Sequence, residues 1–229
     1  MYYKIADCFV KYEPNYMYMQ KKIKPYEERF HGESENSCIY LGYKSDAYYK
    51  KKQKMHPEIT CEKLEYVYVG AEFNRKILKY GGIMIHSSAV EVDGKAYLFS
   101  APCGTGKSTH TKQWQKYFGA DQAIIINDDK PVLRRLEDGW YAYGTPFSGK
   151  TDENVNKKVK LQGICMLERG ENRIRQIQPA EAIPLILQQT IRGKMMEIMD
   201  QLLREVPVYR MQCDISEEAV KMSYEAMKG

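Results

Sequence analysis

The sequence lacks several features that would each assign it to a particular class of protein. No stretch approaches the run of about 18 apolar residues that a membrane-spanning helix needs, and the first residues do not lead into the apolar core of a secretory signal. The six cysteines include no Cys-x-x-Cys pair, because even the nearest two, Cys38 and Cys61, are far apart, which argues against a zinc finger. We therefore expect a cytoplasmic protein without a membrane anchor, whose thiols are buried or incidental.

Net charge is also small for a chain of this length. The 35 Lys and Arg residues outnumber the 30 Asp and Glu residues only slightly, which gives a formal charge of +5. This charge suits an acidic ligand but is too dispersed to indicate one. With 229 residues, of which 43% are hydrophobic, the chain is long enough for one full-sized domain with its own core and a small appendage.

Composition separates the first part of the chain from the rest. Ten of the 19 tyrosines lie within the first 50 residues, among short alternating stretches such as 37–43 that favour β-strands. We predict a small, mostly β module over residues 1–70 and a larger domain over residues 71–229. Basic residues interleaved with tyrosines would also suit a platform for single-stranded nucleic acid, although these tyrosines alternate with polar residues as in any half-buried sheet.

Strand-like and helical patterns alternate through the larger domain. The strand candidates are residues 83–92, 96–100, 123–126, 140–143, 161–167 and 173–177. The helix candidates after them are residues 181–190, 194–204 and 217–228, the last with Ser216 as its cap. The methionine-rich apolar stripe of 194–204 is typical of core rather than of a partner groove. We predict an α/β fold with a mixed sheet flanked by helices.

A glycine loop carries the clearest functional signal. The run Ala101-Pro102-Cys103-Gly104-Thr105-Gly106-Lys107-Ser108 follows an apolar strand and precedes a helical segment, which is the context of a P-loop (Walker A) motif. Glycines let successive backbone N–H groups turn around phosphate oxygens, and the helix adds its positive end. Lys107 would reach the β- and γ-phosphates, and the Ser108 hydroxyl would bind Mg²⁺. Ala101 stands where the full motif has its first glycine.

A predicted hairpin brings a histidine to this loop. Asp93-Gly94 between two apolar-rich strands indicates a two-residue turn, so the strand before the loop is antiparallel to its predecessor. If Val92 faces Lys95, the same register places His86 opposite Ala101. His86 would then bind a phosphate oxygen as a cation or hold a neighbouring carboxylate. The alternative is a half-buried strand histidine satisfied by a carbonyl group.

Further charged residues follow two later strands. Asp128 and Asp129 come directly after the β-branched run 123–126, where a triphosphate site would use them to bind Mg²⁺ and to accept a proton. The alternative is an aspartate-rich turn before Pro131. Lys150, among small residues in the loop 143–151, would stabilise charge on the transferred group, or is a plain exposed lysine.

Four of these segments, 86–95, 100–109, 127–131 and 144–150, resemble the HPr kinase/phosphorylase-like proteins, which are distantly akin to ATP-dependent phosphoenolpyruvate carboxykinases. The resemblance covers about residues 70–215. It implies a kinase that uses ATP and Mg²⁺. The active-site residues of that family are the histidine before the loop, the loop lysine and serine, and the aspartates. They correspond here to His86, Lys107, Ser108, Asp128 and Asp129. It also implies that Gly104, Thr105, Gly106 and Thr109 contact the nucleotide, with Lys150 as a looser counterpart.

We accordingly expect an ATP-dependent phosphotransferase that acts on a serine-type hydroxyl of a small protein, peptide or metabolite. Two alternatives stay open at this point: a non-catalytic or weakly hydrolysing nucleotide-binding module, and a nucleic-acid-binding ATPase. The sequence does not distinguish ATP from GTP or pyrophosphate. It also does not divide metal binding and proton transfer between Asp128 and Asp129, or decide whether the chain forms a homo-oligomer.

Overall fold

The computed structural model describes residues 1–31, 38–149, 151–187 and 195–229, and these form two compact units, Met1–Tyr80 and Gly81–Gly229. Each unit has its own hydrophobic core and is described by itself. Within the described ranges, no helix is both long and apolar enough to cross a membrane.

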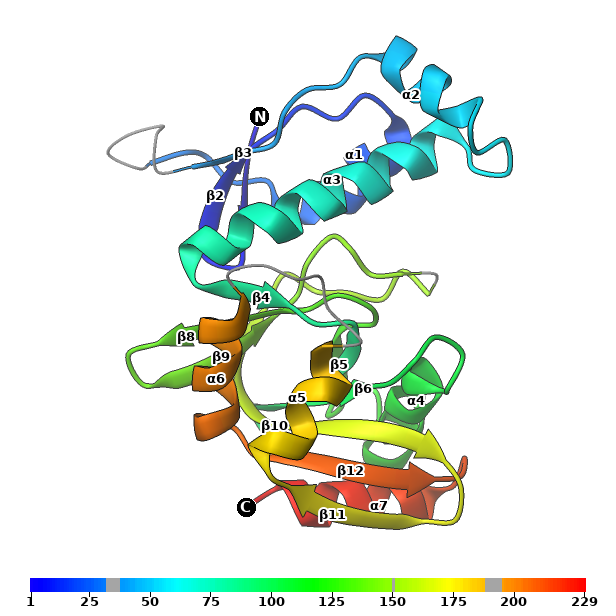
Figure 1. Cartoon of the computed structure of the whole chain (residues 1–229), viewed down its shortest axis with the longest axis vertical. Coiled ribbons are helices and arrows are strands. Elements are labelled where there is room, and N and C mark those ends of the chain that lie inside the picture. The colour runs from blue at the N-terminus through cyan, green and yellow to red at the C-terminus, as the bar shows by residue number, and fades with distance from the viewer. Residues whose placement is uncertain (32–37, 150, 188–194) are drawn as a thin grey trace. The chain divides into compact units, whose positions relative to one another are not determined.

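The described part of the first unit combines a small sheet with helices (Figure 1). Strands β1 (Tyr2–Ile5) and β2 (Cys8–Lys11) form an antiparallel hairpin, and the short β3 (Ile39–Tyr40) pairs parallel to β2. The expected small N-terminal sheet is therefore confirmed, but the prediction of a mostly β unit is wrong, because α1, α2 and α3 contain more residues than β1, β2 and β3, and residues 38–43 supply only β3 and no hairpin. The helical elements are α1 (Met17–Ile23), η1 (Lys24–Tyr26), α2 (Asp46–Gln53), α3 (Cys61–Ile77) and η3 (Leu78–Tyr80). Helix α3 runs continuously through residue 70, so this unit extends to Tyr80.

A buried carboxylate ties α3 to the start of the chain. Glu65 is fully buried, and its Oε1 accepts hydrogen bonds from the Tyr12 hydroxyl at 2.7 Å and from the backbone N–H of Asn15 at 2.6 Å. A buried carboxylate is tolerated only with such donors around it. Tyr3, Tyr12 and Tyr26 are also buried, so these three tyrosines form core and offer no exposed stacking surface.

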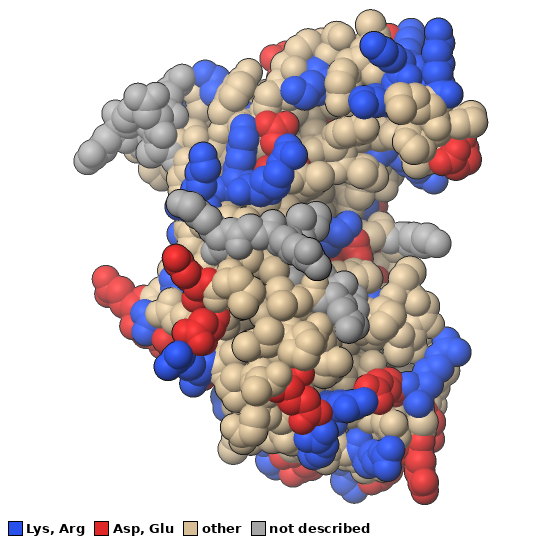
Figure 2. All heavy atoms as spheres, in the orientation of Figure 1, with Lys and Arg blue, Asp and Glu red and all other residues tan. Residues whose placement is uncertain are grey.

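Exposed lysines gather over α2 in Figure 2, whereas positive and negative side chains are mixed on the face of the Gly81–Gly229 unit seen there. Helix α2 is capped by the Ser45 side chain, which accepts a hydrogen bond from the backbone of Tyr48, and only Tyr49 is buried along it. Lys52 lies over the rings of Tyr48 and Tyr68. The lysine run is therefore one solvated face of a short helix.

The Gly81–Gly229 unit is built on a curled mixed sheet flanked by helices, which confirms the predicted fold class (Figure 1). In the described ranges the sheet has nine strands, in the order β4-β8-β9-β10-β6-β5-β7, with β12 pairing β10 and β11 pairing β12. Its strands are β4 (Gly82–Met84), β5 (Ser87–Val92), β6 (Lys95–Ser100), β7 (Ile124–Asn127), β8 (Val132–Leu136), β9 (Gly139–Tyr143), β10 (Lys158–Arg169), β11 (Arg173–Ile177) and β12 (Val208–Cys213). The pairings of β10 with β6 and with β12 are parallel, and the others are antiparallel.

Most predicted strands are present, with two differences. The run predicted as one strand over 83–92 is split into β4 and β5, which are separated at Ile85 and His86. Strands β8 and β12 are additions that the sequence patterns did not indicate. The interruption places His86 directly before β5 instead of inside a continuous strand.

The helices of this unit are α4 (Lys107–Phe118), α5 (Pro179–Leu187), α6 (Met195–Glu205) and α7 (Glu217–Met227). Residues 188–190 of one predicted helix, and Lys194 of the next, lie outside the described residues. In α6 the apolar stripe is core as predicted, since Met195, Met199 and Leu202 are buried. Ser216 caps α7, because its hydroxyl accepts a hydrogen bond from the N–H of Ala219.

An aromatic cluster fixes α4 against the central strand β6. Trp114 is fully buried, and its ring lies 4.9 Å from that of Tyr97 and 5.3 Å from that of Phe99, measured between centroids. Large aromatic side chains dominate the energetics of a core. The two elements that flank the loop, β6 and α4, are therefore fixed to each other by core packing.

Candidate phosphate-binding site

The predicted hairpin register is present in the structure. Val92 pairs with Lys95 and Ser87 pairs with Ser100, joined by a turn in which Asp93 and Gly94 have φ angles of 52° and 72°. Positive φ at both central residues is the geometry of a type I′ turn. His86 directly precedes the paired strand, and its carbonyl oxygen accepts a hydrogen bond of 2.9 Å from the Ser100 hydroxyl. The register thus places His86 beside the start of the glycine loop.

The glycine loop has the backbone conformation that the motif requires. Gly104 and Gly106 have φ angles of 81° and 121°, in the region that favours residues without a side chain. Helix α4 begins directly afterwards at Lys107, and within the described residues no side chain caps its first N–H groups. The first turn of a helix presents such N–H groups and a partial positive charge to an anion. Ala101, in the place of the first glycine, is buried in the core at 1% exposure.

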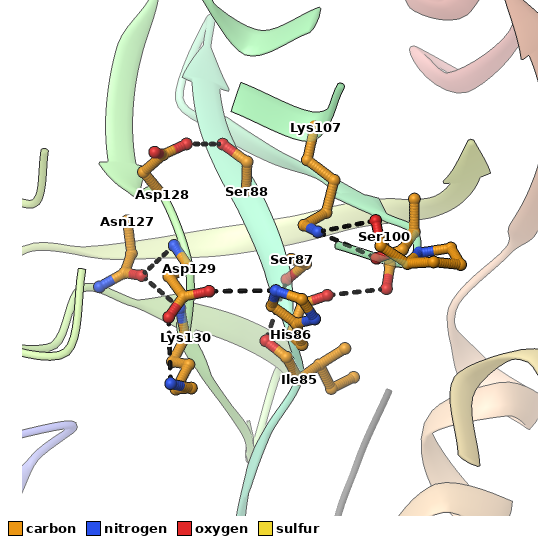
Figure 3. A network of polar contacts seen from close by, with 12 residues as sticks. Ile85, His86, Ser87, Ser88, Ser100, Lys107, Asn127, Asp128, Asp129 and Lys130 are labelled. Carbon is orange, nitrogen blue, oxygen red and sulfur yellow. Dashed lines mark hydrogen bonds and ion pairs between the residues drawn. The ribbon is translucent and has the colours of Figure 1, made fainter. Parts of the chain in front are cut away.

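The Lys107 side chain turns back toward the backbone at the start of this loop (Figure 3). Its Nζ donates to the carbonyl oxygen of Ala101 at 2.9 Å, and the side chain is only 7% exposed. Burial lowers the pKa of Lys107, although the nearby charges of Asp129 and Asp128 act in the opposite direction. The loop lysine and the aspartate pair are therefore close enough to interact electrostatically.

Asp129 is held between the side chains of His86 and Lys130. Its Oδ1 lies 3.1 Å from His86 Nε2, and its Oδ2 lies 3.1 Å from Lys130 Nζ. The Asn127 side chain fixes the turn, since its Oδ1 accepts from the backbone N–H of Asp129 at 2.9 Å. Burial raises the pKa of Asp129, but His86 and Lys130 outweigh it and hold the pKa below its ordinary value of 3.8. Asp129 is therefore ionised at neutral pH, and His86 contacts a carboxylate rather than a carbonyl.

Asp128 has different partners. It is 5% exposed, and its Oδ1 accepts a hydrogen bond of 2.9 Å from the Ser88 hydroxyl, while its Oδ2 accepts one from Thr151. Ser88 Oγ lies 2.8 Å from Thr111 Oγ1, and Thr111 is the donor in this pair because the Ser88 proton goes to Asp128; the Ser108 carbonyl oxygen lies 3.2 Å from the same Thr111 oxygen. A chain of hydroxyl groups thus links Asp128 to the first turn of α4. The sequence patterns gave no signal for Ser88, Thr111 or Thr151, since each acts through a tertiary contact.

The loop after β9 lies against both aspartates. A Cβ atom on Gly149, which has a φ of 69°, would meet Asp129 Cβ at 2.9 Å, so glycine is required both by conformation and by space. Thr151, two residues on, contacts Asp128. Lys150, the remaining predicted site residue, lies outside the described residues. The described parts of this loop therefore border the same site that the glycine loop enters.

The residues at this site fit a magnesium ion bound together with a phosphate. Among the described residues, no group of three His, Cys, Asp or Glu side chains forms a self-sufficient metal site. Mg²⁺ is usually bound by one or two carboxylates and completed by water and substrate phosphates. Ser108, Asp128 and Asp129 carry oxygen atoms of the type that could hold such an ion, and the hydroxyl chain joins Asp128 to α4, which carries Ser108.

A cavity of about 560 Å³ opens beside the loop. One wall consists of the glycine loop itself with Thr109 and Gln113 of α4, and the opposite wall is formed by the ends of β10 and β12, including Leu167 and Asp214. Cavities of this size with mixed apolar and polar walls are typical of small-molecule sites. Thr109, predicted as a nucleotide contact, thus lies where the loop site and the cavity join.

Helix α4 also carries a buried histidine. His110 is 4% exposed, its Nε2 accepts a hydrogen bond of 3.2 Å from the Trp114 indole N–H, and the Ser223 hydroxyl lies 3.3 Å from the same nitrogen. Burial lowers the pKa of His110 from 6.5 to about 4. The imidazole is therefore a neutral part of the core, and it also contributes to the lining of the cavity beside the loop.

This histidine leads to a prediction about acid stability. Between pH 6.5 and about pH 4 the unfolded chain binds a proton at this position that the folded chain does not, so stability falls as the pH is lowered. We expect the free energy of unfolding to fall by about 2 kcal/mol from about pH 7 to about pH 5 on account of His110. Urea unfolding of the wild type and of His110→Gln at both pH values measures this contribution. Equal losses in the two proteins would contradict it.

Comparisons with known proteins yield one finding at the level of structure. No protein-family model matches the sequence, and no curated protein matches it. A solved structure that resembles the model is that of the Hpr(Ser) kinase/phosphatase from Coxiella burnetii, with 12% sequence identity and a TM-score of 0.39, covering 64% of this chain and 99% of that chain. A likeness of this degree assigns neither an activity nor a substrate to this chain.

Proposed function

We propose that the Gly81–Gly229 unit is an ATP-dependent phosphotransferase that moves the γ-phosphate of a magnesium-bound nucleotide to a hydroxyl group. One observation carries the proposal: a buried loop lysine and two adjacent carboxylates converge at a glycine loop that leads into an uncapped helix start. An anion-binding backbone, a cation and paired carboxylates are the parts that phosphoryl transfer needs, because its catalysis is mostly positioning and electrostatic stabilisation.

The two aspartates are proposed to have different roles. Asp128 is linked through Ser88 and Thr111 to the helix turn that carries Ser108, so Asp128 and Ser108 are assigned to Mg²⁺. That ion, when bound, neutralises charge on the phosphates. Asp129 is ionised and contacts His86, so it is assigned to the acceptor hydroxyl.

In the proposed step, the acceptor oxygen forms a bond to the γ-phosphorus as the bond from that phosphorus to the β,γ-bridging oxygen breaks. The hydroxyl proton passes to Asp129, and ADP leaves with the bridging oxygen. Lys107 stabilises negative charge on the phosphates. His86 orients the Asp129 carboxylate through its contact with Oδ1.

The cavity beside the loop supports a nucleotide as the phosphate donor rather than inorganic pyrophosphate. The cavity begins at Gly104–Gly106 and continues past Thr109, the side on which a nucleoside attached to loop-bound phosphates would extend. Pyrophosphate would leave this space of about 560 Å³ unused. Gln113 and Asp214 offer hydrogen-bonding groups for a base or a ribose.

Transfer of labelled γ-phosphate tests the proposal. The protein is incubated with Mg²⁺ and γ-labelled ATP, and candidate acceptors that carry a serine-type hydroxyl are offered: free serine, serine peptides and small proteins. Label in an acid-stable phosphoester on an acceptor is the expected result. Tight nucleotide binding without transfer to any acceptor would contradict the kinase and favour a nucleotide-binding module.

A further inference from the structure

The last residue of β10, Arg169, reaches the glycine loop because of how the strands pair. Strand β10 runs parallel to β6, with Met166 opposite Ser100, the final residue of β6. Three further residues along β10 bring Arg169 level with the loop that follows β6. The position of Arg169 therefore follows from a long-range parallel register and not from any local motif.

The Arg169 guanidinium binds two consecutive carbonyl groups of the loop. Its Nη2 donates to the carbonyl oxygen of Gly104 at 2.7 Å, and its Nε donates to that of Thr105 at 3.2 Å. The guanidinium presents two adjacent N–H donors in one rigid plane, and these match the two carbonyl acceptors. A lysine ammonium does not present such a planar pair of donors.

Holding these carbonyls has a consequence for the opposite side of the loop. In a trans peptide the N–H points away from the preceding C=O, so the Gly106 N–H is directed away from Arg169. The Thr105 N–H, on the other bound peptide, donates to the Pro102 carbonyl at 3.3 Å and keeps the loop closed. Gly106 directly precedes the first residue of α4, so its N–H lies next to the anion-binding helix start.

Neighbouring contacts set Arg169 apart from the other arginine at this edge of the sheet. Glu168 pairs with Arg210 at 2.7 Å, whereas the hydrogen bonds of Arg169 within the described residues go to the two loop carbonyls. Glycines at Gly104 and Gly106 leave the loop backbone with many accessible conformations. A clamp that restricts these conformations before a ligand binds lowers the entropic cost of binding.

We propose that Arg169 is a positioning residue of the phosphate site, which turns the Gly104 and Thr105 carbonyls outward so that the Gly106 N–H is preorganised for a phosphate oxygen. The inference rests on the proposed function, because it concerns the same loop. Arg169 does not contact the reacting atoms. It acts through the loop backbone, and its effect is on phosphate binding.

Binding of Mg²⁺-ATP and of Mg²⁺-tripolyphosphate to the full chain, measured by calorimetry, tests this role. Arg169→Ala is expected to raise both Kd values about tenfold, the scale of a lost charge-assisted hydrogen-bond pair, while kcat changes less than about threefold. Arg169→Lys keeps the charge but not the planar donor pair, so its Kd values should stay within about threefold of those of the alanine variant. The melting temperature without ligand should be unchanged in both variants.

Arg173→Ala provides a matched control, because it removes the same charge from another exposed arginine, which lies on β11, the strand that pairs with β12. Its Kd values should equal those of the wild type. If Arg169→Ala binds as Arg173→Ala does, or if Arg169→Lys restores wild-type binding, the positioning role is overturned and the proposed function stands. If the wild type binds neither ligand, the proposed function and this inference fail together.

Discussion

Lys107→Ala is expected to abolish the thermal stabilisation of the protein by Mg²⁺-ATP. A ligand at a hundredfold its Kd stabilises a folded protein by about 2.7 kcal/mol, which for a chain of this size raises the melting temperature by roughly 5–10 °C. The variant loses the buried ammonium group of Lys107, whose pKa is influenced by the charges of both aspartates. This is the positive charge that the proposed function assigns to the phosphates. We expect its ligand-induced shift to fall below about 1 °C.

Two further variants keep this result interpretable. Lys107→Met retains most of the aliphatic stem, so it separates loss of charge from loss of packing and should behave as the alanine variant does. Lys116→Ala removes an exposed lysine from the same helix and should leave the shift unchanged. An unaltered shift in both Lys107 variants would mean that the glycine loop does not bind the triphosphate.

In the Gly81–Gly229 unit, the sequence predicted those parts of the fold that are determined by residues close together in the chain. The Asp93-Gly94 turn has two residues, which leaves a single pairing register for the flanking strands, so the position of His86 followed from the turn alone. Strand β8 escaped prediction because it begins just after Pro131 and carries Arg134 and Arg135, so that its apolar pattern is short. Strand β12 also has a short pattern, since the alternation of apolar and polar residues from Tyr209 to Cys213 includes only three apolar positions.

In the first unit the errors have a different physical cause. Helix α2 was not predicted, because its lysine-rich part is polar and the helix, which begins after the Ser45 cap, is anchored by one buried tyrosine. A single apolar contact per helix gives no periodic signal. The extent of α3 through residue 70 was also missed, because its buried positions include the polar Glu65.

For the candidate site, the residues predicted from sequence are those whose types are specific for phosphate chemistry, and their roles stay predictions until tested. Their partners could not be foreseen. Ser88 and Thr151 reach Asp128 from two different elements, and Arg169 reaches the loop through the parallel pairing of β10 with β6. Serine, threonine and arginine are common at surfaces and strand ends, so only the tertiary structure distinguishes these copies from the others.

Asp129→Asn is expected to lower the turnover number for phosphoryl transfer by about 10²-fold or more, which is the scale of a lost general base. Asparagine has nearly the same size and keeps an oxygen that can accept from His86, but it cannot take up the acceptor's proton at neutral pH. The Kd for Mg²⁺-ATP should stay within about threefold of the wild-type value, because the phosphate contacts are assigned to the glycine loop and Lys107.

The two aspartates should separate in this experiment. Asp128→Asn is expected to weaken Mg²⁺-dependent nucleotide binding as well as turnover, since its carboxylate is assigned to the metal and is held by the hydroxyls of Ser88 and Thr151. Asp121→Asn, at an exposed position after α4, removes the same charge and should change neither quantity. Steady-state kinetics and calorimetry on the three variants give both readouts. Near-normal turnover in Asp129→Asn would remove Asp129 from the chemistry and leave it as an ion-pair partner that fixes the turn between β7 and β8.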